Sequence, residues 1–228
     1  MRFKQLVVTF AVLALALPLA AQMGIMSRVP TLSGIWHPVV GNGAVYEHTR
    51  EGRDTTSLEF SVIGKEDVAG KTGYWIESAM SDPRAGGNII VKVLEVIDGD
   101  TLSYSRLVMQ MPGQNPMEMD GNMINTGRDS SKPLADLRSK AELVGTESIT
   151  VPAGTFNCEH YRMKDGSGDG WISDKVSPWS LVKMVDNKDK QTTVLVKLIT
   201  DAKDRVTGTP TKFDPTQMMR QRMGQQAQ

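Results

Sequence analysis

A glycine-rich stretch at residues 165–174, DGSGDGWISD, has residue types and a spacing that suit calcium binding. Asp165 and Asp169 stand at positions 1 and 5 of an EF-hand loop, and Gly170 stands at position 6, where such loops bend. The bidentate carboxylate of position 12 is missing, because Val176 stands there. The stretch equally suits a hairpin turn in which the aspartates cap backbone N–H groups. We favour the turn and keep calcium as the alternative.

A second candidate site is a group of five methionines that includes two M-x-M pairs. They are Met109, Met111, Met117, Met119 and Met123. Thioethers are soft ligands that select Cu(I), so a copper site is one interpretation. Methionine also lines adaptable apolar surfaces that accept varied partners, and plain core or loop is a third interpretation. We take Met109, Met111, Met117 and Met119 as candidate ligand-binding residues and predict no bound metal.

Three tryptophans complete the candidate ligand-binding set: Trp75, Trp171 and Trp179. Tryptophans of this kind form binding platforms or, more often, anchor a core, because each buries a large area. Pro178 suits a strand that leaves the sheet to cross an opening. Trp171 and Trp179 would then close one end of a cavity.

Residues for covalent catalysis are sparse. Cys158 and His160 share one face of a predicted strand, but their Cβ atoms would lie about 7 Å apart, too far for a nucleophile and its base. Cys158 is therefore interpreted as a small buried hydrophobic residue. His37 and His48 lack zinc-ligand spacing, and no G-x-S-x-G, H-E-x-x-H, C-x-x-C or phosphate-cradling glycine loop is present. We predict no catalytic residue, no cofactor and no enzymatic activity, unless carboxylates distant in the sequence converge.

The N-terminus has the layout of a secretory signal peptide. Arg2 and Lys4 precede an apolar run at residues 6–17, and the small residues Ala20 and Ala21 follow. The run is short for a bilayer span, so cleavage is favoured over an uncleaved anchor. The predicted location is periplasmic or secreted.

Composition excludes one class of partner and one kind of cross-link. Removal of the signal lowers the count of Lys and Arg from 26 to 24, against 26 Asp and Glu. Nucleic-acid binding needs a concentrated basic face, and the chain shows none. Cys158 is the only cysteine, so an intramolecular disulfide is impossible. Packing must hold the fold, and the roughly 200 mature residues are enough for one core.

Short alternating or β-branched segments predict an antiparallel meander and a second group of strands. The predicted strands are residues 44–49, 58–63, 74–80, 89–96, 102–111, 156–163, 171–173, 181–185 and 193–200. Gly99 between two aspartates is typical of a tight hairpin turn. VPAGT at residues 151–155 is typical of a second turn.

Two helices are also predicted. Residues 131–143 place Leu134, Leu137 and Ala141 on one face after Pro133 in the first turn. Asp214 begins an N-terminal capping pattern for a short C-terminal helix.

The resulting fold class is α+β, mainly antiparallel β, with a strongly curved half-barrel sheet, one central helix and a short C-terminal helix. Residues 1–21 are predicted as signal peptide, 22–40 as an extension, 41–206 as the curved domain and 207–228 as a polar tail with a short helix.

Three stretches carry a family resemblance: GKEDVAGKTGYWIE, VGTESITVPAGTFNCEHYR and GWISDKVSPWSLVKM. They resemble exported bacterial proteins of unknown function that pair a PAGTF turn with a later W-x-SD-x-V-P segment. Those proteins are similar to the LolA and LolB type of half-barrel, an antiparallel sheet over helices with an apolar concavity. The resemblance covers roughly residues 40–200 and implies this fold and export.

These observations predict an exported, non-enzymatic protein that binds an apolar or amphiphilic ligand such as a lipid. Two alternatives stay open: a module that docks on an envelope protein without a small ligand, and an exported protein that binds calcium or copper.

Overall fold

A computed structural model describes residues 35–82, 87–98, 101–121, 123 and 140–214. These residues form one sheet of twelve strands. The strands are β1 (Gly43–Arg50), β2 (Thr56–Val68), β3 (Lys71–Asp82), β4 (Gly87–Asp98), β5 (Thr101–Gln110), β6 (Met117–Asp120), β7 (Ala141–Val151), β8 (Gly154–Met163), β9 (Gly168–Ile172), β10 (Leu181–Asp186), β11 (Gln191–Ile199) and β12 (Thr211–Lys212). Their spatial order is β12-β6-β5-β4-β3-β2-β1-β11-β10-β9-β8-β7.

The predicted α+β class is wrong, because every element whose bounds the structure describes is a strand. The sheet is open and of mixed sense, since β12 runs parallel to β6 while the other pairs are antiparallel. β7 begins at Ala141, so the last three residues of the predicted helix 131–143 are strand, and its residues 131–139 lie outside the described part. Phe213 and Asp214 follow β12 without helix, and the rest of the predicted C-terminal helix lies outside as well.

All nine predicted strands are confirmed: six lie within longer strands, and those predicted at residues 102–111, 171–173 and 193–200 end one residue too late. Asp98 pairs with Thr101, so a tight connection joins β4 and β5 as predicted, although residues 99–100 are not described. Val151 pairs with Gly154 at the VPAGT turn between β7 and β8. The predicted signal peptide at residues 1–21 lies outside the described part. Among the described residues, no helix is long and apolar enough to cross a bilayer.

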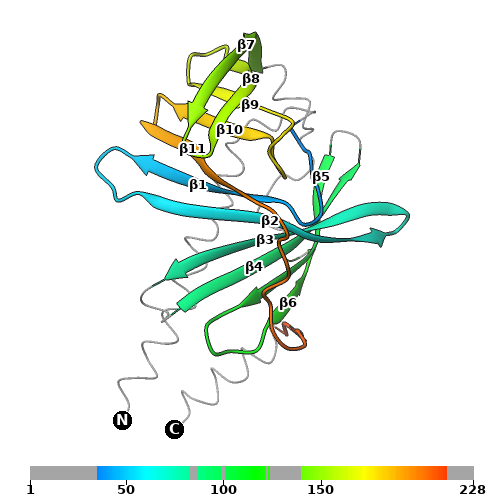
Figure 1. The fold of residues 1–228 in the computed structure, drawn as a ribbon. Helices are drawn as coiled ribbons and strands as arrows, with labels where there is room; N and C mark the ends of the chain where they lie inside the picture. Colours follow the sequence, from blue (N-terminus) through cyan, green and yellow to red (C-terminus); the bar gives the residue numbers. More distant parts are fainter. Residues whose placement is uncertain (1–34, 83–86, 99–100, 122, 124–139, 215–228) are drawn as a thin grey trace.

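The first and last parts of the sheet separate in space. In Figure 1, β8–β11 lie at one end of the molecule and β3–β6 at the other, with β1 and β2 between them. The turn after β7 reaches back to β11, where the Ala153 N–H donates to the Leu195 carbonyl over 3.4 Å. The sheet therefore bends back on itself at its β7–β11 end.

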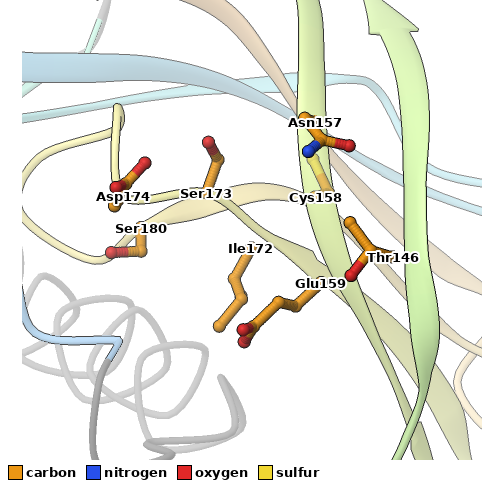
Figure 2. Close-up of a pocket in the computed structure, with 8 residues that line it drawn as sticks. All are labelled: Thr146, Asn157, Cys158, Glu159, Ile172, Ser173, Asp174 and Ser180. Carbon is orange, nitrogen blue, oxygen red and sulfur yellow. The ribbon is translucent and has the colours of Figure 1, made fainter.

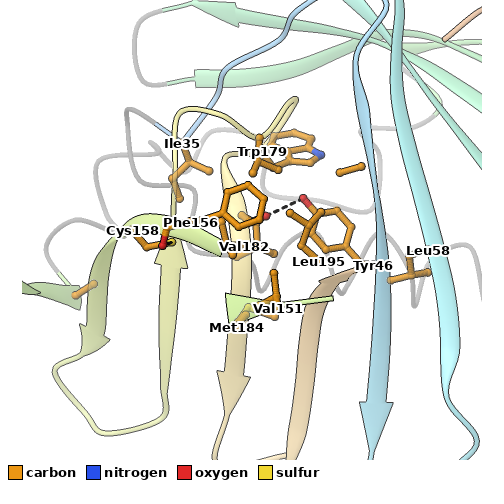
Figure 3. Close-up of a cluster of buried hydrophobic side chains, with 14 residues drawn as sticks. Ile35, Tyr46, Leu58, Val151, Phe156, Cys158, Trp179, Val182, Met184 and Leu195 are labelled. Carbon is orange, nitrogen blue, oxygen red and sulfur yellow. Dashed lines mark hydrogen bonds between the residues drawn. The ribbon is translucent and has the colours of Figure 1, made fainter. Parts of the chain in front are cut away.

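The bent end encloses a cluster of fourteen buried residues, which we call the large core. Leu195 and Val182 are fully buried there, and the Tyr46 ring lies among them in Figure 3. The Tyr46 hydroxyl donates to the Leu181 carbonyl over 3.1 Å, so its polar atom keeps a partner after burial. Trp179 packs at the edge of this core, with its ring 4.5 Å from that of Trp36.

Candidate functional site

Three candidate methionines lie on one face of β5 and β6, and Met111 packs beside them just after β5. Met109 pairs with Val91 on one side and Met117 on the other, and Leu107 pairs in the same way with Val93 and Met119. Residues directly opposite one another in a sheet point to the same side, so these rungs form one apolar surface. We call it the methionine face. Its residues are Ile89, Val91, Val93, Leu107, Met109, Met111, Met117 and Met119.

The methionine face is only partly buried. Ile89, Val91 and Leu107 form a small buried cluster, and Val93, Met109, Met111 and Met119 pack around it. The four methionines all keep part of their surface exposed. The candidates Met109, Met111, Met117 and Met119 therefore form a flexible, polarisable apolar surface that solvent can reach.

A buried acid, Glu95, lies at one end of the methionine face. Glu95 follows Val93 on the same side of β4 and is paired with Tyr74 and Tyr104 in the neighbouring strands. Glu95 is only 2% exposed, and its Oε2 atom has no hydrogen-bond partner. Burial raises the pKa of the Glu95 carboxyl from 4.5 to about 8, because a charge is poorly solvated there. Glu95 is thus a neutral acid beside an apolar surface at pH 7.

The opposite side of the same strands, which we call the polar face, is covered by the chain after β11. Arg205 donates from its Nε to the Glu77 carboxylate over 2.6 Å, and its Nη1 lies 2.8 Å from Glu59. Glu77 is fully buried, and burial raises its pKa although the Arg205 contacts act in the other direction. Thr207 is hydrogen-bonded to Gln110 further along. Residues 202–210 therefore cross this face as a strap, and the chain then joins the sheet as β12.

Trp75 lies on the polar face, away from the methionines. Lys92 and Arg106 place their charged groups 5.1 and 4.9 Å from the centre of its ring. The indole N–H donates to Glu66, which also accepts from Arg106. The sheet itself separates Trp75 from the methionine face.

The other two candidate tryptophans belong to the β7–β11 end. Trp171 stacks on the His160 ring at 4.5 Å, with the Lys183 ammonium 5.0 Å from the centre of the Trp171 ring. Trp179 is 8% exposed and packs in the large core. The structure thus brings the four methionines together but places the three tryptophans at three other positions.

Cys158 and His160 face the same side of β8, but His160 has other partners. Its Nδ1 lies 3.0 Å from Glu147, and its Nε2 lies 2.7 Å from Asp169. With a carboxylate at each ring nitrogen, His160 cannot also activate a thiol. Burial, with a smaller contribution from Glu147, raises the Cys158 pKa to about 11, so the thiol stays protonated.

The two aspartates of the candidate calcium loop have different partners. Asp165 accepts from the Ser167 N–H over 2.9 Å and pairs with Lys188 over 2.8 Å. These contacts hold the Asp165 pKa below its usual range, with the Lys188 hydrogen bond as the largest cause. Asp169 instead contacts His160 and Arg162. Among the described residues, no group of three His, Cys, Asp or Glu is arranged to hold a metal ion.

A polar pocket of about 340 Å³ lies where β8 and β9 separate. Pairing between these strands ends at Glu159 and Ile172, after which the chain turns away from β8. Figure 2 shows its lining side chains, which come from β7, β8, β9 and the segment after β9. They are Thr146, Asn157, Cys158, Glu159, Ile172, Ser173, Asp174 and Ser180.

Reasoning from sequence missed Glu95, the Glu77–Arg205 pair and this pocket. Glu95 had a readable signal, because it falls in step with Ile89, Val91 and Val93 in an alternating strand. An acid at an inward position of a strand indicates an unusual environment. Glu77 and Arg205 are 128 residues apart, and no local pattern links them.

Comparisons with known proteins give limited similarity. No protein-family model matches the sequence, and no curated protein matches it. A crystal structure described as a suspected lipoprotein from Parabacteroides distasonis is 16% identical, with a TM-score of 0.35 over 72% of this chain and 97% of that chain.

Two further crystal structures are similar at the same level. A suspected exported protein with YmcC-like fold from Bacteroides fragilis is 14% identical, with a TM-score of 0.35 over 72% of this chain and 98% of that one. A DUF1329 family protein from Desulfovibrio piger is 12% identical, with a TM-score of 0.32 over 72% and 87%. At these scores the similarities assign no function.

Proposed function

We propose that this chain is an exported protein that binds a single-chain amphiphile on the methionine face and catalyses no reaction. The observation that carries this proposal is the contrast between the two faces of β4–β6. The strap at residues 202–210 covers the polar face, where Asp204 pairs with Lys92 of β4 and Thr207 is hydrogen-bonded to Gln110 of β5, whereas the apolar methionine face keeps exposed area. Export is supported by the signal-like residues 1–21.

The chemistry of the methionine face suits an alkyl chain. Each methylene that leaves water contributes roughly 0.8 kcal/mol, so a chain of modest length gives useful affinity. Within β4–β6, the rungs of this face carry only hydrophobic side chains and thioethers before Glu95, and polar residues border it at Ser78 of β3 and Thr211 of β12. Thioether side chains adjust their conformation readily, which favours broad selectivity for chain length and branching. Such behaviour fits a carrier or a sensor.

Isothermal titration of the mature full chain with a lysophospholipid below its micelle concentration tests the proposal. Met119→Lys places a charge on the methionine face and should lower affinity at least about tenfold, because the ligand would have to desolvate the ammonium. Met119→Leu keeps volume and apolarity and should stay near wild type. Glu118→Gln is the matched control, because Glu118 lies next to Met119 on β6 but on the polar face.

Two results would overturn the proposal. One is the absence of any heat or mass shift with the lysophospholipid, in titration and in native mass spectrometry alike. The other is binding that Met119→Lys and Glu118→Gln change to the same extent.

A second candidate function, docking of an envelope protein, is favoured by the edge strand β7. This strand ends the sheet, and its Leu143 and Val144 are 56% and 49% exposed. An edge with exposed apolar side chains can add a strand from a partner. Leu143→Lys would weaken such docking and leave lysophospholipid binding unchanged, which separates the two functions.

A further inference from the structure

The methionine face concentrates thioether groups on two neighbouring strands. Three of the four positions at which β5 and β6 pair on this face are methionine, namely Met109, Met117 and Met119, and the fourth is Leu107. The residues of β4 that pair with this part of β5 on the same face are valines. The large core, by contrast, has one methionine among its fourteen buried residues. Because β-branched side chains suit strands better, an apolar surface alone does not explain the choice of methionine here.

The register of β5 and β6 brings three thioethers within reach of one another. Met109 and Met117 are directly opposite, so their Cβ atoms lie about 5 Å apart. Met119 is two residues after Met117 on β6, on the same face and about 7 Å along the strand. Each sulfur is two rotatable bonds beyond its Cβ atom, so the three Sδ atoms can converge on a single ion above the sheet. The sequence alone predicts no bound metal, because it does not reveal this register.

Packing supports these side chains without enclosing them. Met109, Met111 and Met119 all pack against the small buried cluster of the methionine face, which restricts them on one side. These three and Met117 each keep part of their surface exposed. An ion from solvent can therefore reach side chains that the sheet already holds close together.

The chemistry of the donors selects the ion. Thioethers are soft ligands that favour Cu(I), whereas calcium and magnesium need oxygen ligands and zinc sites use thiolate, imidazole or carboxylate. Among the described residues of β4–β6, the rungs through Leu107 and Met109 carry no histidine, cysteine or acidic side chain on this face. The apolar surroundings also favour the monovalent over the divalent copper ion, because the lower charge is less costly to desolvate.

We propose that Met109, Met117 and Met119 bind a Cu(I) ion through their thioether sulfurs, with Met111, which packs on the same cluster, as a fourth candidate donor. The amphiphile proposed above would use the apolar character of this face, whereas the copper site uses its sulfur atoms. Substitution of methionine by leucine separates the two proposals, since leucine keeps the volume and apolarity but lacks the donor atom.

NMR of the mature chain, labelled at its methionine methyl groups, tests the proposal with Cu(I) kept reduced by ascorbate under nitrogen. Ag(I), a soft monovalent ion that keeps its oxidation state in air, is the second probe, and Zn²⁺ is the comparison ion. The signals of Met109, Met117 and Met119 should shift with Cu(I) and with Ag(I), and the shifts should saturate at about one ion per chain. Zn²⁺ should leave these signals in place. Equal shifts with Zn²⁺, or no shift with either monovalent ion, would overturn the proposal.

Leucine variants make the test specific. The double variant Met109→Leu with Met117→Leu should lower the affinity for Cu(I) at least about tenfold, since loss of even an outer-shell partner of a metal ligand costs about 10–100-fold. The same variant should bind lysophospholipid as wild type does. Met163→Leu is the matched control, because Met163 is a partly exposed methionine that packs against the large core, and it should change the Cu(I) affinity less than about twofold. Equal Cu(I) affinity of wild type and the double variant would refute the copper site, whatever the lysophospholipid titration gives.

Discussion

The large core and the methionine face belong to one sheet but bury their apolar side chains to different degrees. In the described part of the chain, fourteen buried residues form the large core, whereas three form the buried cluster of the methionine face. Each region also buries a polar atom without a hydrogen-bond partner: Trp179 Nε1 in the large core and Glu95 Oε2 beside the methionine face. The comparison suggests that the bent end supplies stability and that β3–β6 keeps apolar area available for binding.

The largest effect is expected from the carboxyl of Glu95 and its pH dependence. Its pKa is about 8 in the folded chain, above the ordinary value of 4.5 expected after unfolding, so the folded state holds the proton more tightly. Stability should therefore be greatest below about pH 4.5 and should fall as the pH rises to about 8, by at most about 5 kcal/mol. Glu95→Gln should remove this fall in urea unfolding at pH 5, 7 and 9.

Glu77 is present in wild type and in the Glu95→Gln variant, and burial raises its pKa as well. The stability of the variant should therefore still fall as the pH rises, but less steeply than that of wild type. Identical pH dependence of wild type and variant would show that Glu95 does not ionise with the expected cost.

The next largest effect is the loss of stability when one side chain is truncated in each of the two regions. Leu195→Ala removes a fully buried side chain from the large core and should lower the free energy of unfolding by about 3 kcal/mol. Met109→Ala removes a partly exposed side chain from the methionine face and should lower it by about 1 kcal/mol or less. Urea unfolding of both variants checks the difference. Equal losses would mean that the two regions are packed alike.

A smaller effect concerns the strap. Arg205→Gln leaves the fully buried Glu77 without its cation and should destabilise the fold by about 2 kcal/mol, less than for a fully buried pair because Arg205 is partly exposed. A double variant, Glu77→Gln with Arg205→Gln, should recover part of that loss, since no buried charge remains. Thermal unfolding of wild type, Arg205→Gln and the double variant measures these changes in stability. A double variant less stable than Arg205→Gln alone would contradict the explanation.

The parts of the fold that could be predicted from sequence are those with a strong alternation of apolar residues. Leu58, Phe60 and Val62 alternate with polar residues in β2, and this strand was predicted correctly. β7 was missed because it is exposed over most of its length, so it has no apolar period to read. The spacing of Ala141 from Leu134 and Leu137 instead favours a helix.

The candidate site was predictable only where neighbours in sequence are neighbours in space. The M-x-M pairs revealed Met109 with Met111 and Met117 with Met119, because alternate residues of a strand share a face. The positions of the tryptophans could be predicted only if the order of the strands in the sheet were known. Trp75 lies on the other side of the sheet from the methionines. The strap requires a parallel contact of β12 with β6, which no local pattern of the polar tail indicates.

The most direct measurement is NMR of the mature chain labelled at its methionine methyl groups, titrated with a lysophospholipid. Met184 is the internal reference, since it is buried in the large core. The account predicts that the methyl signals of Met109, Met117 and Met119 shift in a saturable way while that of Met184 stays in place. Unchanged signals from all three, or an equal shift of Met184, would contradict it.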